Sequence, residues 1–277
     1  MSIRNKTKGV KMKKVALAVA VVLGFVVIQP VQASNQKALV IVDSYFDSKV
    51  SAPNVKCITL TNTACTDVVT ISNPSLSHPA NHGNAMAEVA KKQNTSVPII
   101  LLVSAAVSSK SVAEVNAGNF IDALNWVNAN SNTVGAVSVS RFFNGNKECS
   151  PATTNTAPYG GVGKADQTIR SLIATLKSKN IPVFVSTGNK PGTKIDYPAC
   201  ITDTVSVSTG SLNSAGVLQS LNALDANTDY VADANISNFE SVVFGRIPHT
   251  TSSATVAVAT QYLVSGLSPT KVVRVNP

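Results

Sequence analysis

The sequence is poor in the side chains that bind transition metals. It holds only three His and four Cys among 277 residues, and no two of the Cys have the CxxC spacing. A structural zinc site needs four such ligands, usually in closely spaced pairs. The composition therefore argues against a metal site and against a required cofactor. No acidic calcium loop is visible either, although structural calcium bound by backbone carbonyls leaves no trace in a sequence and stays open.

Nucleotide-binding motifs and interdomain linkers are also missing. The glycine-rich run Tyr159–Gly163 lacks the Lys-Ser/Thr pair of a P-loop and does not match the dinucleotide-binding fingerprint. No linker rich in Pro, Gly or Ser divides the chain, and no internal repeat is present. We therefore expect a single folded domain without a nucleotide site.

Residues 1–33 are typical of a secretory signal peptide. Basic residues precede an uncharged apolar run from Val15 to Ile28, and Ala33 ends a small-residue cleavage site. The alternative is a transmembrane anchor, but a spanning helix needs about 20 apolar residues, more than this run provides. We expect an exported protein, secreted or periplasmic. Its mature domain would span residues 34–277 and would not be held at a membrane.

The basic charge of the chain is concentrated in that leader. Six of the 23 Lys and Arg residues lie within residues 1–33 and none of the 14 Asp and Glu residues does, so cleavage lowers the formal charge from +9 to +3. A pI above roughly 9 would favour nucleic-acid binding if the charge belonged to the folded domain. Because most of the positive charge belongs to the leader and not to the folded domain, we expect no nucleic-acid partner.

The four cysteines form an even set in an exported chain, which favours two disulfides. Three pairings are possible. A bond between Cys57 and Cys65 is favoured because it closes a short loop, and this leaves Cys149 to pair with Cys200.

Short apolar runs of strand length alternate with segments of helical periodicity. Five runs are typical of buried strands, at residues 38–42, 97–103, 136–140, 181–185 and 204–208. Phe120, Leu124 and Val127 recur at helical spacing, and another helix is expected over residues 164–179. The segment 57–65 is predicted to be a loop. This alternation predicts an α/β fold, a three-layer sandwich with a mostly parallel central sheet flanked by helices.

Four polar residues stand where these elements begin or end. Asp43 follows the first strand, and His82 opens a helical segment. Asn189 follows the strand at 181–185, and Ser252 lies in the first turn of a predicted buried helix. Each alone has a structural explanation, because Asp and Ser are common in turns and at helix caps. The carboxyl ends of parallel strands, however, are where open α/β sheets bind ligands.

These residues and their neighbours resemble four sequence blocks of the subtilisin-like serine peptidases. Val42-Asp-Ser44 looks like the family's Asp block, and His82-Gly-Asn-Ala-Met-Ala87 looks like its His block. Lys179–Asn189 is similar to the strand that carries the oxyanion Asn. Thr251–Thr255 matches the Ser block, Gly-Thr-Ser-x-Ala, at every fixed place except the first. The order Asp, His, Asn, Ser is that of subtilisin, and the resemblance spans residues 38–266.

The resemblance implies an Asp-His-Ser catalytic triad in a secreted serine endopeptidase that acts on protein or peptide substrates. Ser252 would be the nucleophile, His82 the general base, and Asp43 the carboxylate that orients His82. The Asn189 amide and the Ser252 N–H would form the oxyanion hole. The residues that would contact the substrate lie on two segments, with Ser140, Arg141 and Phe142 on one and Ser186, Thr187 and Gly188 on the other.

Some block positions differ from the family pattern and leave alternatives open. Thr250 stands where the Ser block has Gly, Val256 where Pro is usual, and Asn84 where the His block has Thr. A catalytically weak or inactive relative that binds peptides or proteins is one alternative, and an esterase using the same triad is another. Fewer than ten residues separate the predicted cleavage site from the first strand. We therefore expect no pro-domain, maturation without self-cleavage, and a monomer.

Overall fold

A computed structural model describes most of the chain between residues 36 and 274. The described ranges are 36–43, 55–59, 82–103, 107–108, 111–112, 117–140, 164–189, 195–212, 218–220, 222–233, 251–266 and 272–274. All of them belong to one unit, Asn35–Pro277. The predicted leader lies outside these ranges, and so do Arg141, Phe142, Cys65 and Cys149.

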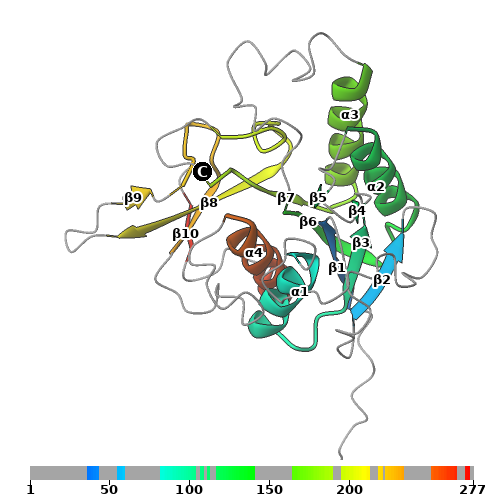
Figure 1. The fold of residues 1–277 in the computed structure, drawn as a ribbon, viewed down its shortest axis with the longest axis horizontal. Coiled ribbons are helices and arrows are strands. Elements are labelled where there is room, and N and C mark those ends of the chain that lie inside the picture. Colours follow the sequence, from blue (N-terminus) through cyan, green and yellow to red (C-terminus); the bar gives the residue numbers. More distant parts are fainter. Residues whose placement is uncertain are drawn as a thin grey trace, which may run out of the picture. The chain divides into compact units, whose positions relative to one another are not determined.

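In the described ranges, nine strands form one sheet (Figure 1). They are β1 (Ala38–Asp43), β2 (Val55–Thr59), β3 (Ile99–Val103), β6 (Val134–Val139), β7 (Val183–Ser186), β8 (Val205–Leu212), β9 (Leu218–Ser220), β10 (Tyr230–Asp233) and β11 (Val272–Arg274). The order is β11-β10-β8-β7-β6-β1-β3-β2, with β9 paired to β8. Only β9 and β11 pair antiparallel in this sheet, so the central sheet is mostly parallel, as predicted. A separate hairpin joins β4 (Val107–Ser108) to β5 (Ser111–Val112).

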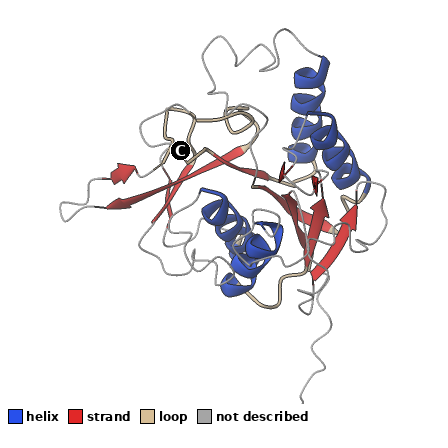
Figure 2. Cartoon of the chain, viewed as in Figure 1, coloured by secondary structure: helices blue, strands red, loops and turns tan. Residues whose placement is uncertain are grey.

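Helices cover both faces of the sheet (Figure 2). They are α1 (His82–Gln93), α2 (Ala117–Ala129), α3 (Lys164–Ser178) and α4 (Thr251–Ser265). Alternate residues of β1 show the two layers: Leu39 and Ile41 pack in the core that contains α1 and α4, whereas Val40 and Val42 pack in the core that contains α2 and α3. A strand buried on both faces needs a continuous apolar run, which β1 has. The predicted α/β three-layer sandwich is confirmed.

Helix α4 is buried along its first ten residues, Thr251–Thr260. It contacts α1 on one side and β6, β7 and β8 on the other. Its run of Ser, Thr, Ala and Val has the small side chains that such a crowded position requires, with Ala254 and Ala257 among them. The helix therefore carries Ser252 into the interior, close to the carboxyl ends of the central strands.

The prediction of a loop at Cys57 is wrong. Cys57 lies in β2, opposite Leu101 of β3, at the edge of the sheet. Edge strands are only partly buried, and Lys56 interrupts the apolar pattern that would have indicated a strand. Cys57 and Cys200 are both disulfide-bonded. Cys65 and Cys149 lie outside the described ranges, so the pairing stays a prediction.

Candidate active site

A buried carboxylate and an imidazole meet where β1 ends and α1 begins. Asp43 is the last residue of β1 and is fully buried, and His82 is the first residue of α1. His82 Nδ1 lies 2.7 Å from Asp43 Oδ2. An ionised carboxylate only accepts hydrogen bonds, so Nδ1 carries the proton of this bond. In the neutral ring, Nε2 is then left as a proton acceptor.

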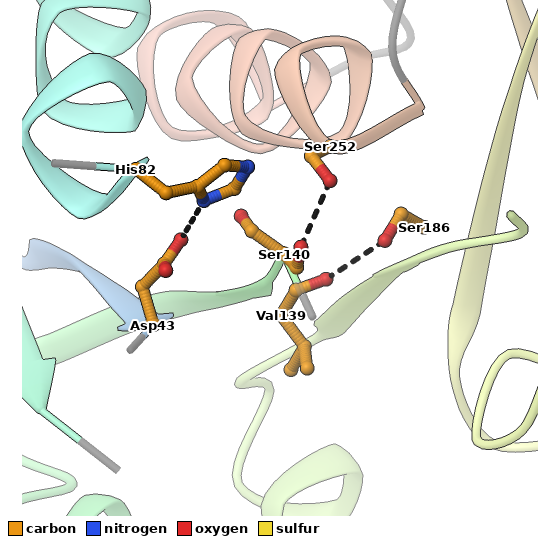
Figure 3. A network of polar contacts seen from close by, with 6 residues as sticks. All are labelled: Asp43, His82, Val139, Ser140, Ser186 and Ser252. Carbon is orange, nitrogen blue, oxygen red and sulfur yellow. Dashed lines mark hydrogen bonds and ion pairs between the residues drawn. The ribbon is translucent and has the colours of Figure 1, made fainter. Parts of the chain in front are cut away.

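Ser252 lies in the first turn of α4, as its sequence context predicts, and is 3% exposed. Its Oγ donates to the backbone carbonyl of Ser140 over 2.8 Å. A Ser hydroxyl has one proton to donate, so here that proton is directed at Ser140 and not at His82. Figure 3 shows Ser252 and the His82 ring on the same side of Ser140. Rotation about the Ser252 Cα–Cβ bond is the motion that would redirect the hydroxyl.

The Asn189 side chain bridges the end of β7 to the start of α4. Its Oδ1 accepts hydrogen bonds from the Thr251 backbone N–H over 3.0 Å and from the Thr251 hydroxyl over 2.9 Å. A backbone N–H can only donate, so the amide atom facing it must be the oxygen. The Asn189 NH₂ group is consequently turned away from Thr251. Asn189 itself is exposed, so a ligand can reach it.

Two of the side chains predicted to contact the substrate form hydrogen bonds inside the protein. Ser186 Oγ donates to the Val139 carbonyl over 3.3 Å (Figure 3). Thr187 Oγ1 donates to the Ala223 carbonyl over 2.8 Å. Both residues and Gly188 are buried. These side chains tie neighbouring segments together, so any contact of Ser186 or Thr187 with a substrate would come from the backbone.

The structure thus brings together residues from four separate parts of the chain. Asp43 and His82 are 39 positions apart, and Ser252 and Ser140 are 112 positions apart. The first turn of a helix has backbone N–H groups without an acceptor in the helix, and the helix dipole is positive there. A hydroxyl, an imidazole held by a carboxylate, and a site favourable to negative charge are the components of nucleophilic acyl transfer.

No protein-family model matches the sequence, and no curated protein matches it. Solved structures do match the fold. The nisin leader peptidase NisP from Lactococcus lactis is 11% identical with a TM-score of 0.52, over 85% of this chain and 80% of that chain. Sphericase is 14% identical with a TM-score of 0.51, over 85% of this chain and 81% of that chain. The prenylagaramide maturation protease PagA is 14% identical with a TM-score of 0.51, over 86% of this chain and 80% of that chain.

This chain has a subtilisin-like fold. Its structural neighbours are serine proteases and leader peptidases, so the fold is one on which proteases are built. Because the sequences are only 11% to 14% identical, the likeness concerns the fold alone.

Two residues that adjoin the candidate site are not apparent as candidates from the sequence. Thr251, which holds Asn189, was seen only as part of the Ser block. Asp196 was not singled out, although it is a single charged residue in the otherwise uncharged segment Ile195–Ile201 and is 6% exposed. A buried charge between apolar residues is the signal that could have identified it.

The segment that contains Asp196 is attached to α3 through a buried polar cluster. The Tyr197 hydroxyl donates to Asp166 Oδ1 over 2.8 Å, and Arg170 Nε donates to Asp166 Oδ2 over 2.8 Å. Tyr197 is joined to Pro198 by a cis peptide bond. The cluster ties the turn that follows Asp196 to α3.

Clusters of metal ligands and membrane-spanning helices are both absent from the described ranges. No group of three or more His, Cys, Asp or Glu side chains is placed to hold a metal ion among the described residues. None of the helices in those ranges is both long enough and apolar enough to cross a membrane.

Proposed function

We propose that the protein is an exported serine endopeptidase that cleaves peptide bonds with Asp43, His82 and Ser252. The observation that carries the proposal is the 2.7 Å hydrogen bond from His82 Nδ1 to the buried Asp43. Figure 3 draws this pair together with Ser252, which lies in the first turn of α4. The subtilisin-like fold supports it because the structural neighbours are proteases. One neighbour is a leader peptidase, which supports a protein or peptide substrate.

In the proposed reaction Ser252 first turns its hydroxyl from the Ser140 carbonyl towards His82. Ser252 Oγ then attacks the peptide carbonyl carbon while His82 Nε2 takes the hydroxyl proton. Collapse of the tetrahedral intermediate breaks the C–N bond, and His82 returns that proton to the leaving amine. Water hydrolyses the acyl-enzyme by the same two proton transfers, which restores Ser252. Asp43 stays ionised and stabilises the imidazolium.

The oxyanion would be bound by two donors. The Ser252 backbone N–H belongs to the first turn of α4, where no helical carbonyl accepts it. The Asn189 NH₂ group is turned away from Thr251 by the two hydrogen bonds that Oδ1 accepts. Loss of such an Asn lowers kcat by about 10² to 10³, a value known from subtilisin itself.

Several features of the mature protein are part of the same proposal. The leader would be removed after residue 33, giving a secreted or periplasmic monomer whose peptidase domain spans residues 34–277. Disulfides would join Cys57 to Cys65 and Cys149 to Cys200. Ser140, Arg141 and Phe142 would line one side of the substrate, and Ser186, Thr187 and Gly188 the other.

A fluorophosphonate probe on the purified exported protein tests the proposal, because it reacts covalently with activated serines. The wild type is compared with Ser252→Ala and with a matched control, Ser253→Ala, which removes the neighbouring hydroxyl of the same helix. We expect labelling of the wild type and of Ser253→Ala and none of Ser252→Ala. Circular dichroism of each variant establishes that it is folded.

Absence of Ser252-dependent labelling would contradict the proposal and favour a protein that binds peptides without cleaving them. Hydrolysis of casein and hydrolysis of short-chain esters are then measured on the same preparation of the protein. Casein cleavage that depends on Ser252 supports the endopeptidase. Ester hydrolysis without any cleavage of casein would favour an esterase.

A further inference from the structure

Two serines at the end of β6 are buried without a hydrogen bond. Ser138 lies in β6 and is 0% exposed, and Ser140 directly follows the strand and is 1% exposed. Within the part of the chain that the structure describes, neither hydroxyl has a hydrogen-bond partner. Burying a hydroxyl without a partner is unfavourable. The stability of the free protein therefore does not explain either side chain.

The Ser140 side chain lies next to Asp43. Val139 of β6 is aligned with Val42 of β1, and the Ser140 N–H donates to the Val42 carbonyl over 3.5 Å. Ser140 and Asp43 are thus the next residues along two neighbouring parallel strands, which lie about 4.8 Å apart. Figure 3 shows the Ser140 hydroxyl directed to the side of His82 and Asp43, whereas the Ser140 carbonyl faces Ser252.

Both side chains point to the same face of the sheet. Ile41 of β1 and Ala136 of β6 pack in the core that contains α1 and α4. Alternate residues of a strand point to one face, so Asp43 and Ser140 point to that face as well. A carboxylate has about four acceptor positions, so Asp43 can accept a further hydrogen bond whatever else it binds. A turn about the Ser140 Cα–Cβ bond would bring the hydroxyl to it.

The backbone of Ser140 is tied to the nucleophile of the proposed reaction. Its carbonyl accepts the Ser252 hydroxyl over 2.8 Å, and this bond must break before Ser252 can turn to His82. Asp43 meanwhile binds His82 Nδ1 over 2.7 Å. Ser140 is therefore in contact with the nucleophile through its carbonyl and adjacent to the Asp43–His82 pair through its hydroxyl.

We propose that Ser140 is a positioning residue whose hydroxyl donates to Asp43 once Ser252 has turned to His82. This inference rests on the proposed function. The bond would keep the carboxylate from rotating, and with it the His82 ring, while Nε2 takes the proton of Ser252. Hydrogen bonds to ionised groups are about twice as strong as those between neutral groups. Because the free protein lacks this bond, its contribution belongs to the reacting arrangement and lowers the barrier.

Ser140→Ala tests the inference on the purified exported protein, because it removes the hydroxyl and keeps the backbone carbonyl. We expect kcat for a fluorogenic peptide to fall about tenfold, the effect of one hydrogen bond to a charged group. KM should be unchanged, since the bond forms in the reacting arrangement. The melting temperature should not fall, because the hydroxyl has no partner to lose. A lower melting temperature with wild-type kcat would show a structural serine and overturn the inference.

Ser138→Ala is the matched control, because it removes an equally buried hydroxyl that also lacks a partner. Ser138 is aligned with Ile41 and Phe184, and not with Asp43. Its loss should leave kcat unchanged. Ser140→Thr retains a hydroxyl and should keep kcat within about threefold of the wild type. An equal fall of kcat in Ser138→Ala and Ser140→Ala would overturn the inference.

A second measurement needs no variant. In a crystal structure of the wild type with a fluorophosphonate bound to Ser252, the tetrahedral phosphorus group takes the place of the reaction intermediate. Ser252 Oγ then has no proton to donate to the Ser140 carbonyl. We expect Ser140 Oγ within about 3.0 Å of a carboxylate oxygen of Asp43. A Ser140 hydroxyl that stays without a partner, or that binds another group, would overturn the inference.

Fluorophosphonate labelling of the same samples separates this inference from the proposed function. Ser252-dependent labelling together with wild-type kcat in Ser140→Ala overturns only the role of Ser140. Absence of labelling overturns the peptidase and the role of Ser140 with it.

Discussion

Thr251→Val tests how Asn189 is held in the orientation that the proposed oxyanion hole needs. Val keeps the β-branched shape of Thr but has no hydroxyl. The change removes the 2.9 Å hydrogen bond from the Thr251 hydroxyl to Asn189 Oδ1 and leaves the 3.0 Å bond from the backbone N–H. A partly buried hydrogen bond of this kind contributes about 1 kcal/mol. We therefore expect kcat/KM to fall about fivefold.

The comparison with Asn189→Ala makes the prediction specific. That variant removes the amide itself and should lower kcat by about 10² to 10³. Because Thr251 is expected to act only through Asn189, the double variant should be no slower than Asn189→Ala. A double-mutant cycle would then give a coupling energy of about 1 kcal/mol.

The assay measures kcat and KM on a fluorogenic peptide for the wild type and the three variants, with thermal unfolding as the control for folding. The loss in Thr251→Val should appear in kcat, because the oxyanion forms only during the reaction. Losses that simply add in the double variant would refute the reasoning. A change confined to KM would refute it as well.

Three further predictions concern other residues of the same region. If the proposed triad is correct, Asp43→Asn should reduce kcat about 10⁴-fold, as the loss of the ionised carboxylate does in Ser-His-Asp enzymes. The melting temperature would show that the fold persists, and near-normal kcat would argue against the triad. Gly188→Ala should lower the free energy of unfolding by about 3 kcal/mol, because the new β-carbon would overlap Asp196 and because φ at this position is +113°, where Ala is strained. Urea titrations measure this change, and an unchanged midpoint would contradict it. Tyr197→Phe removes the hydroxyl that donates to Asp166 Oδ1 and leaves Arg170 as the remaining donor to this carboxylate. It should lower the unfolding free energy by about 2 kcal/mol, and coinciding curves in the same titration would disprove this.

The local sequence indicated the buried central strands and the helix periodicity. The apolar run Ala38–Val42 could be recognised as a buried strand because burial on both faces requires apolar residues at every position. Helix α3 places Ile169, Ile173 and Leu176 in the core at helical spacing, and this periodicity is also visible in the sequence. Strand β2 was not predicted, because an edge strand tolerates polar residues and so lacks the continuous apolar run of a buried strand.

The candidate site likewise has features that the sequence predicts and features that only the tertiary structure shows. Asp43, His82 and Ser252 could be proposed from sequence because each stands at the boundary of an element and within a recognisable block. Their mutual geometry could not, since the 2.7 Å contact of His82 with Asp43 depends on β1 lying next to β3 in the middle of the sheet, with α1 packed against both. The hydrogen bond from Ser252 to Ser140 likewise follows from the packing of α4 on β6.

Asp196 shows most clearly what only the tertiary structure decided. Nothing in the spacing of Gly188 and Asp196 indicates that they touch, because the segment between them forms no repeating pattern. The contact arises when Asp196 pairs its backbone with Thr187 and its carboxylate fills the space that glycine leaves open. Periodicity records which residues are buried, whereas the contact between Gly188 and Asp196 depends on how the chain after β7 folds back so that Asp196 pairs with Thr187.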